Sequence, residues 1–184
     1  MKTSTQSNIP SASHKAGGGS HLPVLVTDTR EQRPLVFEHL DSIPETLQTG
    51  DYSIKGFIDT FSVERKSIPD LLNSITHERQ RFEKELHRLI GIGARGFARL
   101  LIVGTKNELM EALSHRKITQ NTVIGSLCSI DSDGVPVVWR PTPEKAAEWV
   151  ESCAVYFYNR KLKQLGQAYQ TPAWARAAAM DMIP

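Results

Sequence analysis

The chain has 184 residues, of which 40% are hydrophobic and 23% are charged, and its formal net charge is +2 at pH 7. This composition is typical of a globular protein with one buried core, and so small a net charge identifies no class of binding partner. A membrane-spanning helix is excluded because no run of about twenty apolar residues occurs, and the beginning of the chain lacks the apolar segment of a signal peptide.

The first part of the chain, residues 1–22, is rich in small polar residues and glycine and has almost no large apolar side chain. Such a segment cannot offset the entropy that it would lose on ordering, so we expect a disordered N-terminal tail. We expect the ordered domain to span residues 23–166. Residues 167–184 are then a C-terminal tail.

The first predicted strand spans residues 23–28, a short apolar run that ends in an acid. A highly polar turn follows it, so Asp28, Arg30 and Glu31 lie at the carboxyl end of a strand. Open α/β sheets place their ligands at this end. The alternative is that these residues are the charged groups of a solvated loop.

Two further strands are predicted at residues 47–54 and 58–66, and a short connection that contains Gly56 joins them. This pattern favours an antiparallel hairpin. Asp51 and Glu64 could then approach each other across it. The alternative for Asp51 is a turn acid that follows Gly50.

The second of these strands carries an acid and a lysine two residues apart. Because side chains alternate along a strand, Ser62, Glu64 and Lys66 share one face. A helix is predicted directly after them, with Ser67 as its N-cap and Asp70 where a capping-box acid would lie.

A long helix is predicted from residue 68 to about residue 90, because apolar residues recur at spacings of three and four. Its other face mixes arginine and lysine with glutamate, which usually indicates local ion pairs on a solvated face. The alternative is that Arg79 or Arg81 contacts a DNA phosphate.

The rest of the chain alternates between strands and helices. Strands are predicted at residues 97–104 and 135–139, and helices at residues 106–113, 119–130 and 143–165. The first of these strands is apolar on both faces, which suits a sheet covered by helices. The cysteines, Cys128 and Cys153, have no metal-ligand spacing, which favours reduced thiols in an intracellular protein. The fold class that follows is α/β, a mixed β-sheet flanked by helices.

The last long helix is apolar on more than one side, since Ala147, Ala154, Tyr156 and Tyr158 lie outside its main stripe. An exposed apolar patch of this kind suits a partner subunit, so we expect a homodimer or heterodimer through this helix. The alternative is that the C-terminal segment, which contains Trp174, covers the patch.

The acids at the ends of the predicted strands suggest a metal site. Asp28, Asp51 and Glu64 would repel one another unless a cation joined them, and Mg²⁺ or Mn²⁺ prefers such oxygen ligands. An ion of this kind can assist phosphodiester hydrolysis, with Lys66 positioning water or neutralising developing charge. The candidates for phosphate contacts or for orienting the acids are Arg30 and Arg65.

These residues form three motifs in a recognisable order. The motifs are DTRE at residues 28–31, GDY at residues 50–52 and ERKSIPD at residues 64–70, followed by RFEKEL at residues 81–86. Together they resemble the XPF/MUS81/Hef (ERCC4-type) nuclease domain family, whose hallmark is Glu-Arg-Lys followed, after three intervening residues, by Asp. The similarity covers approximately residues 24–165.

The resemblance implies a restriction-endonuclease-like, PD-(D/E)XK fold and a metal-dependent, structure-selective endonuclease acting on branched or flap DNA. Such an enzyme would act wherever DNA is repaired, recombined or replicated, in the nucleoid or the nucleus. The residues implied to bind metal are Asp28, Asp51 and Glu64, with Lys66 assisting catalysis. The residues implied to support them are Arg30, Glu31, Arg65 and Asp70, and Asp70 is either a helix cap or the partner of Arg65.

Two features qualify this expectation. Family members often carry tandem helix-hairpin-helix modules, which residues 167–184 are too short to form, so branch recognition would come from the catalytic domain, a dimer or another protein. The family also includes catalytically silent DNA-binding or scaffold subunits, but these typically lose the motif acids that this chain keeps. An unrelated metalloenzyme acting on nucleotides is disfavoured because the chain has no glycine-rich phosphate loop.

Overall fold

The computed structural model of the chain describes residues 22–167 and 169–181. The expected N-terminal tail lies, apart from Leu22, outside these residues. The described strands are β1 (Leu25–Asp28), β2 (Ser42–Glu45), β3 (Tyr52–Ile54), β4 (Phe61–Ser67), β5 (Phe97–Val103) and β6 (Val137–Arg140). The described helices are α1 (Ile68–Thr76), α2 (Arg79–Gly93), α3 (Lys106–Ser114), α4 (Gln120–Ser132), α5 (Pro143–Gln164) and α6 (Ala173–Met180).

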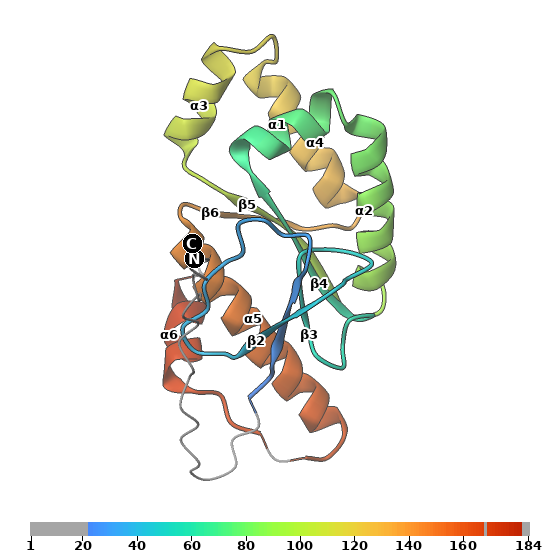
Figure 1. The fold of residues 1–184 in the computed structure, drawn as a ribbon, viewed down its shortest axis with the longest axis vertical. Coiled ribbons are helices and arrows are strands. Elements are labelled where there is room, and N and C mark those ends of the chain that lie inside the picture. Colours follow the sequence, from blue (N-terminus) through green and yellow to red (C-terminus); the bar gives the residue numbers. More distant parts are fainter. Residues whose placement is uncertain (1–21, 168, 182–184) are drawn as a thin grey trace, which may run out of the picture.

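The six strands form one mixed sheet in the order β2-β1-β3-β4-β5-β6. β3 is antiparallel to both of its neighbours, whereas β1 pairs with β2, β4 with β5 and β5 with β6 in parallel. Helices cover both faces, as Figure 1 shows. The mixed, helix-flanked sheet confirms the predicted fold class.

Each face of the sheet has its own apolar core. On one face, Phe61 and Val63 of β4 and Leu101 of β5 pack against α5 and α6. On the other face, Leu100 and Ile102 of β5 pack against α1, α2, α3 and α4. Strand alternation explains this division, because neighbouring residues of one strand point to opposite faces. It also places Glu64 and Lys66 of β4 on the face that α1 and α2 cover.

The predicted hairpin of β3 and β4 is present, but its first strand is shorter than expected. Only Tyr52–Ile54 is strand, because Gly50 adopts a positive φ of 78° and turns the chain away before it. The structure also has one strand that the sequence pattern did not indicate. β2 is an exposed edge strand with Pro44 inside it, so it carries neither alternation nor an apolar run.

The single helix predicted from residue 68 to residue 90 is wrong. The structure has two helices there, α1 and α2, and the break lies at His77 and Glu78, whose backbone N–H groups both donate to the Asn73 carbonyl. Residues 76–81 are all polar, so a change of direction there exposes no apolar side chain. The break lets Phe82 and Leu89 of α2 reach the core.

The expected C-terminal tail contains α6, which packs on α5 and buries Ala175. Ala147 and Ala154, part of the apolar surface that predicted a partner subunit, are buried within the chain itself. Of the other two residues of that surface, Tyr158 packs against Phe57 and Tyr156 is exposed. Dimerisation itself stays a prediction.

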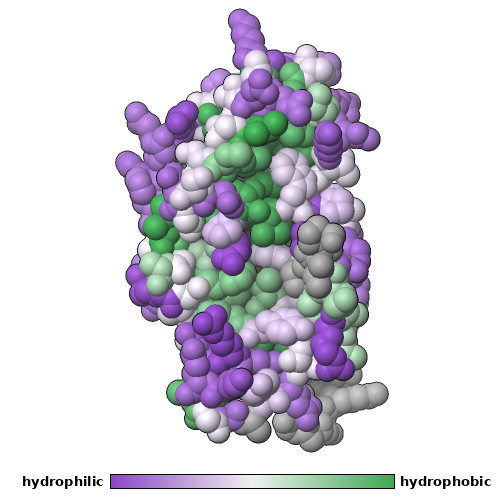
Figure 2. Space-filling view, turned by 180° about the vertical axis from the view of Figure 1, so that it is seen from behind, coloured by the Kyte–Doolittle hydropathy of each residue, from purple (hydrophilic) through white to green (hydrophobic). Residues whose placement is uncertain are grey.

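Some apolar surface remains exposed. Seen from behind, hydrophobic residues form a band down the middle of the molecule, bordered by hydrophilic ones (Figure 2). The apolar residues that are exposed include Tyr156, Leu165 and Met180. Among the described helices, none combines the length and the apolar character that crossing a membrane requires.

Candidate active site

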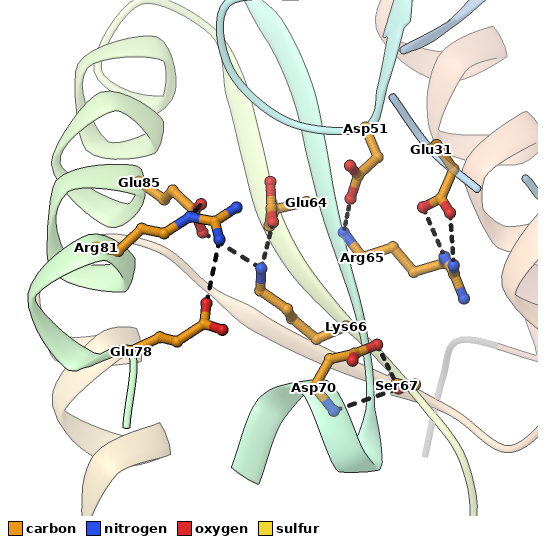
Figure 3. Close-up of polar contacts among 10 residues, drawn as sticks. All are labelled: Glu31, Asp51, Glu64, Arg65, Lys66, Ser67, Asp70, Glu78, Arg81 and Glu85. Atoms are coloured by element: carbon orange, nitrogen blue, oxygen red, sulfur yellow. Dashed lines mark hydrogen bonds and ion pairs between the residues drawn. The ribbon is translucent and has the colours of Figure 1, made fainter. Parts of the chain in front are cut away.

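The centre of the candidate site is the pair of Glu64 and Lys66 on β4 (Figure 3). Because the two residues share a face of the strand, the ammonium Nζ of Lys66 lies 2.7 Å from Oε1 of Glu64. Both side chains are largely buried. The ammonium also lies 3.3 Å from Oε2 of Glu85 and 5.4 Å from the centre of the Phe82 ring. Lys66 is therefore held from three sides, and two of these contacts come from α2.

Asp51 reaches the same region from the turn that precedes β3. The positive φ of Gly50 directs the chain so that the Asp51 N–H donates to the Val63 carbonyl. In return, the backbone N–H of Arg65 donates to Oδ2 of Asp51 at 2.7 Å. A Cβ atom at position 50 would lie 2.1 Å from the Ser62 hydroxyl oxygen, so the turn needs glycine. The predicted approach of Asp51 and Glu64 across the hairpin is confirmed.

The carboxyl groups of Asp51 and Glu64 are buried close to each other, which makes it unfavourable for both to carry a negative charge. Burial, reinforced by repulsion from Glu64, raises the pKa of Asp51 to about 8. Burial also raises the pKa of Glu64, although Lys66 opposes the effect. Burial disfavours the charged form of Lys66, but its pairs with Glu64 and Glu85 outweigh this and raise its pKa. Lys66 is thus an ammonium at neutral pH, facing carboxyl groups that resist full ionisation together.

The third predicted ligand, Asp28, has a different environment. Its carboxylate accepts four hydrogen bonds, three from Arg30 and one from the backbone N–H of Leu47, at 2.7–2.9 Å. The hydrogen bond from the Arg30 side chain, working against burial, lowers the pKa of Asp28 to about 2. Asp28 thus fastens the turn after β1 to the segment between β2 and β3.

Arg65 and Glu31 form a second, largely buried ion pair beside the site. The guanidinium Nη2 of Arg65 lies 3.1 Å from Oε1 of Glu31. Glu31 also accepts the backbone N–H of Arg33. The pair joins β4 to the turn after β1, so Arg65 orients this part of the site through its side chain and Asp51 through its backbone.

Asp70 lies at the start of α1 on the surface. Its carboxylate accepts a hydrogen bond from the Ser67 hydroxyl at 2.5 Å, and the Ser67 oxygen accepts the backbone N–H of Asp70. The predicted N-cap at Ser67 is confirmed. Of the two roles expected for Asp70, the structure shows the helix cap, because the partner of Arg65 is Glu31.

Arg79 and Arg81 lie on the exposed face of α2 and form ion pairs along the helix. Arg79 pairs with Glu83, and Arg81 pairs with Glu78 and Glu85. Contact of either arginine with DNA stays a prediction. Glu85 is the site residue that sequence reasoning missed. Its spacing of three from the core residue Phe82, which places it at the border of the buried face, was the available signal.

The residues fit a divalent cation in part. Among the described contacts, Oδ1 of Asp51 and Oε2 of Glu64 accept no hydrogen bond, and a cation between the two would relieve their repulsion. Within residues 22–167 and 169–181, however, no group of three or more acidic, histidine or cysteine side chains is arranged to hold a metal ion. Asp28 is occupied by Arg30 instead. Metal binding by Asp28, Asp51 and Glu64 stays a prediction.

Comparison with known proteins places these residues in context. The sequence model described as the ERCC4 domain matches residues 27–153. Two solved structures are similar in fold, both of XPF from Aeropyrum pernix. The first has a TM-score of 0.56 and 20% identity, and the match covers 78% of this chain and 68% of that chain. The second, in complex with DNA, has a TM-score of 0.56 and 18% identity, with 85% and 78% covered. A search of curated proteins finds no match.

Proposed function

This chain belongs to the ERCC4 domain family, a family of nucleases with the restriction-endonuclease-like fold, and we propose that it is a DNA endonuclease dependent on Mg²⁺ or Mn²⁺. Its reaction would be the hydrolysis of phosphodiester bonds in branched or flap DNA during repair, recombination or replication. The observation that carries this proposal is the buried group formed by Asp51, Glu64 and Lys66. An acid pair beside a fixed ammonium suits phosphodiester hydrolysis better than it suits a scaffold.

We assign the metal-binding role first to Asp51 and Glu64, each of which has one uncommitted carboxylate oxygen. Asp28 completes the set only by giving up contacts to Arg30 and Leu47. Asp51 and Glu64 would hold the divalent cation, which would supply Lewis-acid chemistry for phosphodiester hydrolysis.

Lys66 acts as a fixed positive charge in this proposal. Its ion pairs keep it protonated at neutral pH, so it is not a general base. A protonated Lys66 can donate hydrogen bonds to an attacking water or to a phosphate oxygen that gains charge in the transition state. Arg65 and Glu31 hold the surrounding backbone in position, and Arg30 holds Asp28.

The decisive experiment is cleavage of labelled flap, fork and linear DNA with Mg²⁺ or Mn²⁺. We expect Asp51→Asn, Glu64→Gln and Lys66→Met to lose at least 10²-fold in rate. Glu111→Gln, an exposed carboxylate on α3, is the matched control and should cleave as the unmodified protein does. Cleavage of no substrate, or equal activity in the Lys66 variant, would remove the proposal.

The alternative is a catalytically silent subunit that binds DNA or serves as a scaffold. Its distinguishing result is binding of branched DNA without uptake of Mn²⁺ in a calorimetric titration. The same preparation also tests dimerisation, because sedimentation equilibrium gives the mass directly. A partner subunit that binds through α5, as the sequence predicts, would use the part of this helix where Tyr156 is exposed.

A further inference from the structure

A hollow on the surface of the described residues lies away from the acids of the candidate site. It has a volume of about 690 Å³ and lies between α5 and residues 93–99, the segment that joins α2 to β5. We call it the basic groove and define it by Arg95, Arg99, Tyr156, Arg160 and Lys161. A second hollow of about 370 Å³ shares Lys161 with it and extends it toward the β3–β4 turn.

The groove lies on the face of the sheet opposite Glu64 and Lys66. Phe97 lies against the core that α5 covers, whereas Leu100, the residue that pairs with Glu64, belongs to the other core. The groove also lies near the start of β4, since Phe97 pairs with Phe61. A ligand in the groove therefore contacts the chain at a place separate from the carboxylates.

The basic groove itself carries charge of one sign. Four cationic side chains line it and no carboxylate does, whereas Asp59 lines the second hollow that extends it. Within the described part of the chain, no ion pair involves Arg95, Arg99, Arg160 or Lys161. The cations of α2 that face solvent behave differently, because Arg79 and Arg81 each pair with a glutamate. The groove thus concentrates positive charge with which no acidic side chain of residues 22–167 and 169–181 forms an ion pair.

Aromatic rings hold two of these cations in place. The Arg99 guanidinium lies 4.3 Å from the centre of the Phe97 ring, and the Lys161 ammonium lies 5.3 Å from that of Phe157. Among the described residues, Arg99 donates to the neighbouring Ala98 carbonyl, and burial lowers the pKa of its guanidinium although Cys153 and Asp131 oppose the effect. Tyr156 is 41% exposed at the same surface. Cations fixed on rings lose little entropy when an anion binds.

We propose that the basic groove binds a single-stranded segment of nucleic acid, with its cations on the phosphates and a base stacked on Tyr156. A positively charged groove with an accessible aromatic ring is the usual arrangement for such strands. A second copy of this chain is a poorer occupant, because a two-fold interface would bring the same four cations together. The choice of nucleic acid rests on the proposed function, but binding through the groove does not require cleavage.

The test is fluorescence anisotropy of a labelled single strand of about twenty thymidines, with EDTA present so that metal-dependent cleavage is excluded. Arg160→Glu combined with Lys161→Glu should weaken binding at least about tenfold. It should also reduce the slope of log K against log salt by about 1.4, from two lost phosphate contacts. Lys55→Glu with Lys163→Glu makes the same change in charge at exposed positions outside the groove, and should stay within about twofold.

Tyr156→Ala tests the stacking contact, and should weaken binding of the single strand about tenfold while leaving binding of a duplex unchanged. Because Tyr156 is exposed, Tyr156→Ala should melt close to the temperature of the parent, whereas the groove pair gives up the contact of Lys161 with Phe157, so its melting temperature is measured beside its binding. Equal losses in the groove pair and the control pair would overturn the proposal. So would a groove pair whose mass halves in sedimentation while its DNA binding is kept, since the groove would then be a subunit interface.

The result separates this proposal from the nuclease activity. Glu64→Gln should bind the single strand as the parent does, although it does not cut. If the double variant of Arg160 and Lys161 loses binding and the parent cleaves no DNA, binding by the groove is supported and the nuclease activity is refuted. If the parent cleaves DNA and the double variant of Arg160 and Lys161 binds normally, the nuclease activity is supported and binding by the groove is refuted.

Discussion

Asp28 has two competing roles that one variant can separate. The sequence motif predicts that it binds metal, whereas in the structure its carboxylate accepts hydrogen bonds from Arg30 and Leu47 and so stabilises the fold. The change is Asp28→Asn, which keeps the size of the side chain but replaces one acceptor by a donor. An amide –NH₂ would then face the Arg30 guanidinium or the Leu47 N–H, both of which are donors.

The magnitude follows from the pKa. Lowering the pKa of Asp28 from 3.8 to about 2 corresponds to about 2.5 kcal/mol of folding stability at neutral pH. Because the Arg30 side chain is largely exposed, solvent screening reduces this figure, and we expect Asp28→Asn to lose about 1–2 kcal/mol and about 2–8 °C of Tm. Because the folded pKa is depressed, this stabilisation is present above pH 4 and is lost as the pH falls from about 4 to about 2.

The assay is urea unfolding at several pH values in the presence of EDTA. Asp41→Asn, an exposed acid just before β2, is the control and should change stability by less than about 0.5 kcal/mol. A double-mutant cycle with Arg30→Met should show strong coupling to Asp28. The reasoning is refuted if Asp28→Asn is as stable as the parent at pH 7, and Asp28 would then be available to a cation alone.

Three further predictions concern single side chains. Gly50→Ala should lower the free energy of unfolding by at least about 2 kcal/mol, since φ is 78° and the new Cβ would meet Ser62. Gly56→Ala, with φ 82° and open space around the Cβ, should lower it by only about 1 kcal/mol. Thermal melting measures both, and equal losses of stability would contradict this. Glu85→Gln should lower kcat about tenfold with little change in KM, because Lys66 loses one of its ion pairs. Glu83→Gln, which removes only an ion pair with Arg79, should leave kcat unchanged. A change in KM alone would argue against a role of Glu85 through Lys66. Burial raises the pKa of Cys153 to about 12, so its thiol should react with a disulfide reagent at pH 7.5 at least about tenfold more slowly than that of the exposed Cys128. A fast phase that survives in Cys128→Ser would disprove this.

The sequence predicted the β-strands that carry clear patterns. β4 and β5 have either alternation or an apolar run, and the face shared by Glu64 and Lys66 followed from alternation alone. β2 was not predicted, because an exposed edge strand that contains Pro44 has no alternating or apolar sequence pattern. The break between α1 and α2 at His77 was not predicted, because a polar stretch of sequence is compatible both with the exposed face of one long helix and with the junction between two helices.

The sequence indicated Asp51, Glu64 and Lys66 as neighbours but did not indicate Glu85 or most of the contacts between the residues of the candidate site. Asp51 and Glu64 followed from the hairpin, which is a local structure. The partners of Arg65 and Lys66, namely Glu31 and Glu85, come from elements distant in sequence and depend on how α2 and the turn after β1 pack. No local pattern reports such packing, and the one-sided charge of the basic groove is visible only once α5 lies beside residues 93–99.

One feature of the fold bears on the order in which its parts form. Glu151 of α5 accepts the backbone N–H groups of His39 and Leu40, 112 and 111 positions away, and His39 stacks on Trp174 of α6. By contrast, the contact between Asp51 and Arg65 spans only 14 positions. Because contacts of long sequence separation form late in folding, the hairpin that carries the acids should organise before α5 and α6 close over the other face. Early protection from hydrogen exchange in β3 and β4, ahead of residues 39–40, would be the kinetic record of that order.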